Sequence, residues 1–133
     1  MIYLELGDLL AIATEVLGLE VDQLLHITDL GLADSALARP QASFGGTDFY
    51  PELSEKAASL LHSVAKNHAF LDGNKRVAVV ATLQFLKLNG FDLDLEPPSE
   101  SYEVIAGVAG GSVDFAELEK WLRPRLMEHE ARG

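Results

Sequence analysis

The chain contains no cysteine, a single tryptophan and few aromatic residues of any kind, which make up 8% of its 133 positions. Without cysteine it forms neither disulfides nor thiolate metal sites, and this composition is compatible with a reducing cytoplasm, where we expect the protein to act. Positive charge is also scarce, because 10 lysine and arginine residues stand against 21 acidic ones, for a formal net charge of -11. Direct nucleic-acid binding and attachment to an anionic membrane both need clustered cations, so the overall charge argues against either role.

Long apolar runs are missing as well. The longest apolar stretch, VAVVATLQFL, is interrupted by Thr82 and Gln84 and falls short of the roughly 20 residues that a membrane-spanning helix needs. The N-terminal sequence MIYLELGDLL carries no basic region typical of a signal peptide. A length of 133 residues fits one domain, so we expect a single domain over residues 1–133, with a polar tail at 124–133 that frays.

Helical periodicity dominates the sequence that remains. The segment 54–67 is amphipathic, and the segment 74–88 is apolar on most sides, so we expect the second to be a central, buried helix. Shorter helices are expected at about 8–17, from 22, at 32–38, at 98–108 and from 114, and the expected N-caps include Asp8, Ser54 and Asp114. Residues 91–95 read as a short strand or an extended link. The sum is an all-α domain of about six helices.

The segment RPQASFGGTDFYP, residues 39–51, breaks this helical pattern. It has a proline near each end, a Gly-Gly pair and three aromatic residues. Such a composition predicts an extended loop or a small β-hairpin. The segment is either a packed surface loop or a binding flap.

The few cations concentrate around one glycine-broken turn, HAFLDGNKR at residues 68–76. Residues 1–65 hold ten acids and two bases, whereas residues 66–87 hold four bases and one acid. A local reversal of charge in an acidic protein points to an anionic ligand at this turn, although a run of charge is also typical of an ordinary solvated face.

Four residues of this turn are suited to binding phosphate. A helix that begins near Asn74 directs backbone N–H groups and the positive end of its dipole toward the turn. Gly73 allows a positive φ and a close approach of the backbone to a ligand. Lys75 and Arg76 add cations where phosphate charge would lie.

Three further residues supply reactive or supporting groups. Asp72 offers a hard carboxylate oxygen that could hold Mg²⁺ beside a phosphate. His68 could act as a general base toward a hydroxyl, since histidine as a residue type titrates near neutrality. Phe70, if buried, would pin the loop so that its neighbours point outward. One turn thus contains the parts needed for attack of a hydroxyl on a nucleotide phosphate.

Each feature has an ordinary alternative. Asp-Gly-Asn is a common turn sequence, and a lone histidine at a helix end is more often a cap or core residue than a catalyst. The spacing does not fit an EF-hand or a Walker A loop, and the four scattered histidines do not make a zinc site.

The nine residues together resemble the signature of the Fic/Doc family, H-x-F-x-[D/N]-[G/A]-N-[G/K]-R. Lys75 stands where most Fic proteins carry glycine, which points to the Doc branch, the "death on curing" toxins of bacterial toxin–antitoxin modules. The surroundings DLGLADSALARPQASFGG and AASLLHSVAKNHAF are similar to Doc proteins as well, so that the resemblance covers about residues 1–123. It implies an all-α Fic fold with a small hairpin or extended flap.

The resemblance also implies an activity. Fic/Doc proteins transfer a group from ATP, with Mg²⁺, to a protein hydroxyl; typical Fic enzymes transfer AMP, and the Doc branch phosphorylates a threonine of elongation factor Tu and blocks translation. Carried over, His68 is the general base and Asp72 the Mg²⁺ ligand. The nucleotide phosphates would meet Gly73, Asn74, Lys75 and Arg76. The family's flap, which docks the target by main-chain pairing, would include Arg39, Ser43, Phe44, Gly45 and Gly46.

Departures from the family pattern refine this reading. Ala69 replaces the proline common after the histidine and removes no chemical group. Val79 stands where AMP-transferring members carry a second arginine, which weakens the AMP-transfer reading. An inhibitory S/T-x-x-x-E-G/N helix is missing from the sequence, so we expect restraint by a separate Phd-like antitoxin whose C-terminal segment folds onto the toxin. Three alternatives stay open: a Doc-type kinase, an AMP or other nucleotide transferase, and a non-catalytic binding module.

Overall fold

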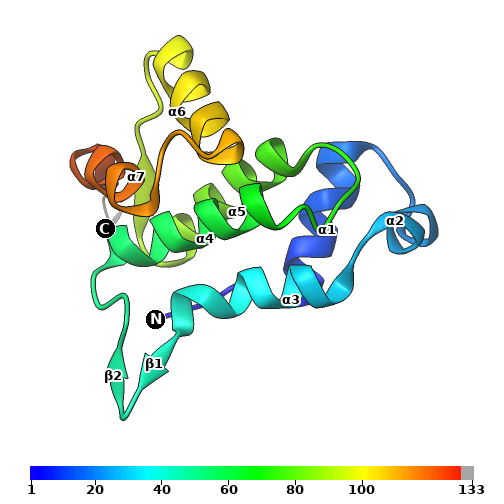
Figure 1. Ribbon diagram of the computed structural model, residues 1–133, viewed down its shortest axis with the longest axis horizontal. Helices are drawn as coiled ribbons and strands as arrows, with labels where there is room; N and C mark the ends of the chain where they lie inside the picture. The colour runs from blue at the N-terminus through cyan, green and yellow to red at the C-terminus, as the bar shows by residue number, and fades with distance from the viewer. Residues whose placement is uncertain (130–133) are drawn as a thin grey trace.

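The computed structural model describes residues 1–129 of the chain. These residues form seven α-helices, two 3-10 helices and four short strands (Figure 1). The helices are α1 (Leu6–Leu17), α2 (Val21–Ile27), α3 (Leu30–Ala38), η1 (Arg39–Gln41), α4 (Leu53–Asn67), α5 (Asn74–Leu88), α6 (Pro98–Gly110), α7 (Phe115–Leu122) and η2 (Arg123–Arg125). The strands are β1 (Ser43–Phe44), β2 (Thr47–Asp48), β3 (Phe91–Leu93) and β4 (Leu126–Glu128). The all-α fold with a small hairpin is confirmed, with seven α-helices rather than about six. None of these helices is long and apolar enough to cross a membrane, as far as residues 1–129 are concerned.

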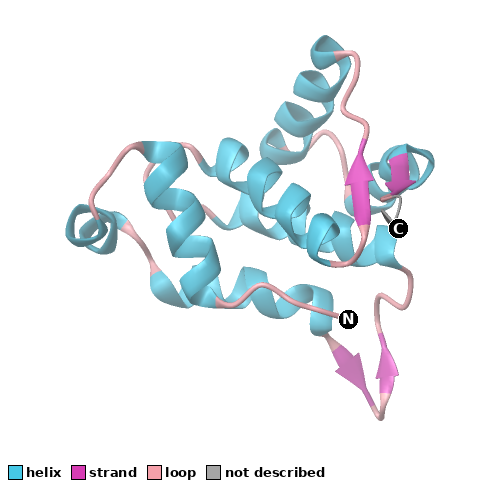
Figure 2. Cartoon of the chain, turned by 180° about the vertical axis from the view of Figure 1, so that it is seen from behind, coloured by secondary structure: helices cyan, strands magenta, loops and turns pink. Residues whose placement is uncertain are grey.

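Helices α4 and α5 run side by side in opposite directions at the centre of the molecule (Figures 1 and 2). Helix α4 contacts α3, α6 and α7 in addition to α5, and α1 packs against α5. The turn 68–73 joins the central pair, so it starts and ends on the two helices that pack against the most other elements. A loop held at both ends in this way can present side chains in a defined geometry.

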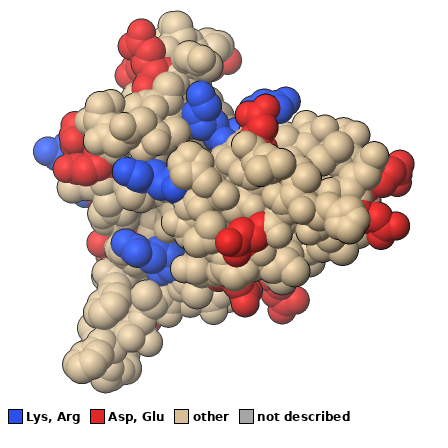
Figure 3. Space-filling model, turned by 45° about the vertical axis from the view of Figure 1, so that its right-hand side comes forward, with Lys and Arg blue, Asp and Glu red and all other residues tan. Residues whose placement is uncertain are grey.

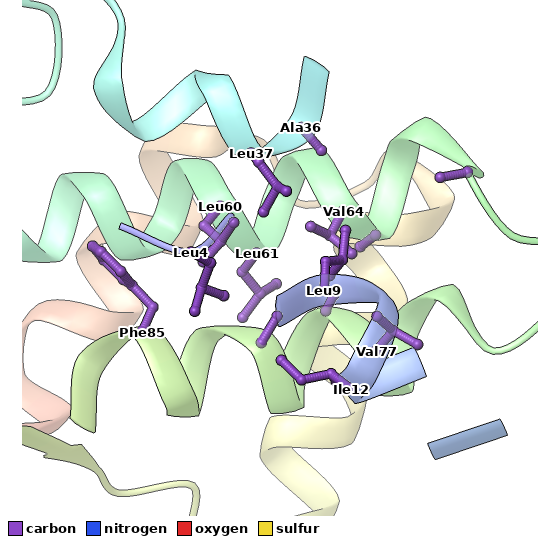
Figure 4. Packing of buried hydrophobic residues seen from close by; sticks show 14 of the residues in the cluster. Leu4, Leu9, Ile12, Ala36, Leu37, Leu60, Leu61, Val64, Val77 and Phe85 are labelled. Carbon is purple, nitrogen blue, oxygen red and sulfur yellow. The ribbon is translucent and has the colours of Figure 1, made fainter. Parts of the chain in front are cut away.

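The core lies between the central pair and the N-terminal helices. Figure 4 shows Leu60, Leu61 and Val64 of α4 pointing toward Val77 and Phe85 of α5, with α1 and α3 closing the cluster from the other side. All five side chains are at most 2% exposed. The apolar periodicity of both segments is thus satisfied by their pairing.

The expectation that residues 74–88 are buried holds for one side of α5 only. Val77, Ala78 and Ala81 are fully buried, whereas Val80 is 37% exposed and Val79 is partly buried. An apolar stripe of α5 is consequently left facing outward, and it lines a hollow between α1, α5 and α6.

Two of the three expected N-caps are wrong by one or more residues. Helix α1 begins at Leu6, so Asp8 lies inside its first turn and accepts a hydrogen bond from the backbone N–H of Glu5 at 2.8 Å. Helix α4 begins at Leu53, and the Ser54 hydroxyl donates to Glu119 of α7 at 2.6 Å instead of capping its own helix. The Ser54 hydroxyl binds a carboxylate that is distant in the sequence, and the local sequence pattern does not reveal this partner. Asp114 is confirmed as the cap of α7.

The expected fraying of the C-terminal tail is wrong for residues 126–128. These residues form β4, which pairs antiparallel with β3 in the register Phe91↔Glu128 (Figure 2). The Arg125 guanidinium lies 4.2 Å from the centroid of the Trp121 ring and donates to the Glu96 carbonyl at 2.9 Å. The partner strand lies more than 30 residues away, so the tail sequence alone did not indicate this pairing. Residues 130–133 of the expected tail lie outside the described residues.

Candidate active site

The turn leaves α4 at His68, which adopts a left-handed backbone conformation with φ 52 and ψ 43. It is the one non-glycine residue with positive φ in residues 1–129. This conformation costs an ordinary side chain about 1–2 kcal/mol, and such strain often marks positions that function selects. The turn ends α4 abruptly and leaves the histidine exposed.

Phe70, in the middle of the turn, has a buried side chain, as the sequence predicted. This side chain is 2% exposed, and the neighbouring Ala69 carbonyl accepts a hydrogen bond from the Asp29 N–H at 2.7 Å. Leu71 is by contrast 80% exposed. The turn therefore buries Ala69 and Phe70 and exposes the next two residues, Leu71 and Asp72.

Asn74 has a structural task that the sequence did not reveal. Its buried amide accepts from the Phe70 N–H at 3.1 Å and donates to the Phe70 carbonyl at 2.8 Å. Asn74 was predicted to lie in the phosphate cradle, and its side chain closes the turn on itself. Its backbone N–H, at the first position of α5, is the group left to face a ligand.

Gly73 is required by both backbone and space. Its φ is 77, and a Cβ atom there would lie 2.3 Å from Cδ2 of Leu17. Its N–H donates to Oδ1 of Asp72 at 2.8 Å, which orients that carboxylate at the mouth of the turn. Helix α5 begins directly after it, so the backbone N–H groups of residues 74–76 have no partner within the helix and can bind an anion.

A hollow of about 440 Å³ lies over this turn. It collects five of the predicted site residues, namely His68, Asp72, Gly73, Asn74 and Lys75. Its far wall is α6, which contributes the small residues Ala106, Ala109 and Gly110. Arg76 does not line this hollow; it lines a neighbouring one. The candidate base, metal ligand and anion cradle therefore open into the same space, with room for phosphate groups.

The wall of small residues on α6 was missed by the sequence interpretation. Its signal is the run IAGVAGG at residues 105–111, in which alanines and glycines recur at helical spacing. Nothing in it tells which helix it will face, because that depends on how α6 packs against α4 and α5.

Cations gather on the face that carries the site. Figure 3 shows lysine and arginine side chains in a band from the base of the hairpin to the foot of α6, while acidic side chains lie mostly around the edge. Burial lowers the pKa of His62 on α4, and the nearby charges of Lys66 and Arg39 lower it further. Lys66 near the end of α4 and Lys75 and Arg76 at the start of α5 are the cations nearest the turn, and they would attract an anionic ligand there.

Asp72 fits a magnesium ion that arrives with a nucleotide better than a resident metal. One of its oxygens is used by Gly73, and the side chain is exposed. In residues 1–129 no three histidine or acidic residues come close enough together to hold a metal alone. Mg²⁺ is commonly held by one or two carboxylates plus substrate phosphates, and the donors present match that pattern.

The segment 39–51 forms the predicted hairpin, which projects from the helices (Figure 1). Gly45 and Gly46 have φ of 60 and 83, as the two-residue turn of a tight hairpin requires. Phe44 is 80% exposed, and Ser43 pairs with Asp48 across the hairpin. Both strands have an open edge to which an extended peptide could pair.

The hairpin does not line the 440 Å³ hollow. It adjoins the start of α4, whereas His68 lies at the end of this 15-residue helix, about 22 Å away along its axis. Arg39 lies at the base of the hairpin, where its Nε donates to the Tyr50 hydroxyl at 3.3 Å. The predicted docking role of the hairpin therefore concerns target segments well removed from the reacting atoms, and it stays a prediction.

Lys56 anchors the hairpin and was not singled out from the sequence. It is 3% exposed, and its Nζ lies 3.4 Å from Oδ2 of Asp48 and 3.3 Å from the Pro40 carbonyl. Burial works to lower the pKa of Lys56, but contacts with Tyr3 and Asp48 outweigh it and raise that pKa overall. A lysine that stays charged here ties β2 to the start of α4.

Comparisons with known proteins show which family the chain is similar to. A family model described as the Fic/DOC family matches residues 3–86, from α1 through most of α5. The chain belongs to the Fic/Doc family. Toxin Doc from Mycolicibacterium smegmatis (strain ATCC 700084 / mc(2)155) is 48% identical over 91 residues, which cover 68% of this chain and 67% of that protein. Protein kinase doc from Escherichia phage P1 is 31% identical over 97 residues, which cover 73% of this chain and 75% of that protein. The Fic/Doc match spans the turn and both helices that hold it.

Proposed function

We propose that this Fic/Doc protein is the toxin of a toxin–antitoxin module and a protein kinase that transfers the γ-phosphate of ATP to a target hydroxyl. The observation that carries the proposal is that His68, Asp72, Lys75 and the N-terminus of α5 open into one hollow. The names of the two relatives, a Doc toxin and a Doc protein kinase, support it.

In the proposed reaction His68 takes the proton from the target hydroxyl. The hydroxyl oxygen bonds to the γ-phosphorus, the bond from that phosphorus to the β–γ bridging oxygen breaks, and ADP leaves. The N–H groups at the start of α5 and the ammonium of Lys75 stabilise charge on the phosphate oxygens. When bound, Mg²⁺ at Asp72 neutralises charge on the triphosphate and helps to orient it.

AMP transfer by the same site is the second candidate. Its basis is the shared Fic/Doc motif, and the presence of Val79 and Lys75 argues against it. ATP labelled at either the γ or the α position distinguishes the two. We expect the target to gain label from the γ position only; label from the α position would replace the kinase proposal with nucleotide transfer.

For the target and the partner we propose a threonine of elongation factor Tu and a Phd-like antitoxin. Incubation with purified elongation factor Tu, ATP and Mg²⁺, followed by peptide mapping, should find one phosphothreonine. Transfer to a different protein would leave the kinase proposal standing and overturn the target.

A non-catalytic binding module is the third candidate. Growth arrest on expression separates it from the enzymes, since His68→Ala removes the base but leaves the exposed surface nearly unchanged. We expect this variant to lose toxicity while it still binds the antitoxin. Full toxicity of His68→Ala would instead favour a binding module.

A further inference from the structure

Helix α4 ends differently from the other two helices whose last turn is followed by a left-handed residue. In α1 and α6 that residue is a glycine, Gly18 and Gly111, and backbone hydrogen bonds run from it back into the last turn of its own helix. In α4 the left-handed residue is His68, and within residues 1–129 neither its N–H nor that of Ala69 bonds back to a carbonyl of α4. The bonds that commonly close a helix end in this conformation therefore do not hold His68.

Two hydrogen bonds to the start of α3 lie on either side of His68 instead. The Asp29 N–H donates to the Ala69 carbonyl at 2.7 Å, and the side-chain amide of Asn67 donates to the Leu32 carbonyl at 3.3 Å. Ala69 is buried and Asn67 is half-buried, whereas the histidine between them is exposed. The two neighbours of the histidine are thus bound to one other part of the fold.

The start of α3 is stabilised by its own cap. The Asp29 carboxylate accepts a hydrogen bond from the Leu32 N–H at 3.0 Å. This bond joins the two residues that contact the turn, and α3 as a whole packs against α4. Both anchors of the turn therefore belong to one capped helix end, and loss of the cap would loosen both.

We propose that Asn67 and Asp29 are positioning residues for the reaction, which keep the His68 imidazole directed into the hollow over the turn by holding its left-handed backbone. The inference rests on the proposed function, because it takes His68 to be the base. Neither positioning residue lines the 440 Å³ hollow, so both act through the histidine. A right-handed conformation is the one that histidine prefers, and it would turn the imidazole and the chain after it in another direction.

The strength of a hydrogen bond limits the expected effect. A general base must lie within hydrogen-bond reach of the proton that it takes, so only molecules with His68 in its left-handed conformation contribute to kcat. Removal of one such bond changes the ratio of two conformations by at most about fivefold, which corresponds to about 1 kcal/mol. We therefore expect a loss of about two- to fivefold in kcat for each positioning residue.

The first test measures phosphate transfer from Mg²⁺–ATP at saturating target protein, on the full chain. Asn67→Ala and Asp29→Ala should each lower kcat about two- to fivefold and leave the KM for ATP unchanged, since neither side chain lines the hollow. Asp29→Asn keeps an oxygen that can cap α3 and should restore kcat. Gln23→Ala is the matched control: the Gln23 amide also makes one exposed hydrogen bond, from the Glu20 N–H at 3.0 Å on α2, and its loss should leave kcat unchanged.

A second readout does not depend on enzymatic activity. NMR relaxation of the backbone amide gives the order parameter of His68, which is about 0.85 in rigid backbone and below about 0.6 in flexible backbone. We expect this order parameter to fall in Asn67→Ala and in Asp29→Ala. It should stay at the value of the unsubstituted protein in Asp29→Asn and in Gln23→Ala.

Other results overturn the inference. Asn67→Ala with an unchanged kcat, or with an unchanged order parameter at His68, shows that the start of α3 does not position the histidine. A loss in Asp29→Asn equal to that in Asp29→Ala would assign the effect to the charge of residue 29 and not to the cap. These results leave the kinase proposal intact. An unsubstituted chain that transfers no phosphate would instead overturn the kinase proposal, and the order parameters would still decide whether the start of α3 holds His68.

Discussion

Asn74 closes the turn of the site, and its replacement by alanine measures how much that closure stabilises the fold. The change removes two hydrogen bonds, at 3.1 and 2.8 Å, and leaves the Phe70 N–H and carbonyl without these partners in a buried place. Two such bonds contribute about 1 kcal/mol each, and a stranded buried group adds about 1 kcal/mol. We therefore expect Asn74→Ala to lower the free energy of unfolding by about 2–3 kcal/mol.

That loss has a visible thermal consequence. With an unfolding entropy of about 2 cal/mol/K per residue, a chain of this length should lose about 7–11 °C in Tm. Thermal and urea unfolding followed by far-ultraviolet circular dichroism measure both quantities. Asn67→Ala is the control: its amide makes one bond, to the Leu32 carbonyl at 3.3 Å, so less than about 1 kcal/mol should be lost.

The competing reading is that the Asn74 amide contacts the nucleotide directly. It predicts an unchanged Tm together with weakened ATP binding. That combination would refute the structural task assigned to this side chain. A lowered Tm with ATP binding recovered at low temperature would support it.

The remaining predictions concern other parts of the site and its scaffold. Phe70→Ala should cost about 3–5 kcal/mol in urea unfolding, because the ring is 2% exposed; a neutral result would contradict the pinned turn. Asp72→Ala should abolish Mg²⁺-dependent transfer while Tm stays within about 2 °C, since the carboxylate is exposed; activity that persists would exclude it as the metal ligand. Gly73→Ala should lower stability by about 1–2 kcal/mol through its left-handed φ and its contact with Leu17, and an unchanged urea midpoint would argue against that strain. The hydrogen bond from Arg123 lowers the pKa of Glu119 below 4.5, against the effect of burial, so its contribution to stability is present above pH 4.5 and is lost as pH falls through the lowered value. As pH falls below 4.5, the urea midpoint of Glu119→Gln should accordingly fall less steeply than that of the unsubstituted protein. Equal dependence of the two midpoints on pH would refute the assignment.

Several features of this protein were determined by residues close together in the sequence. The helices 54–67 and 74–88 follow from apolar periodicity over one segment each, and the Gly-Gly pair marks the turn of the hairpin within four residues. The candidate site could be predicted for the same reason, because its base, its carboxylate and its cations lie within the nine residues 68–76. Local propensity and a helix terminus bring these groups together before any other part of the fold is known.

Other features depended on contacts between distant segments. Ser54 binds a carboxylate 65 residues away, and β4 pairs with a strand more than 30 residues before it, so neither could be read from its own neighbourhood. Two hollows depend on how α6 packs against the central pair. One lies between the outward side of α5 and Tyr102, and the other lies between His68 and the small residues of α6. The sequence by itself determined which chemical groups meet at the turn, since they are neighbours along the chain. Only the tertiary structure decided the shape of the space in front of them, because that space is bounded by helices whose positions depend on burial of the whole core.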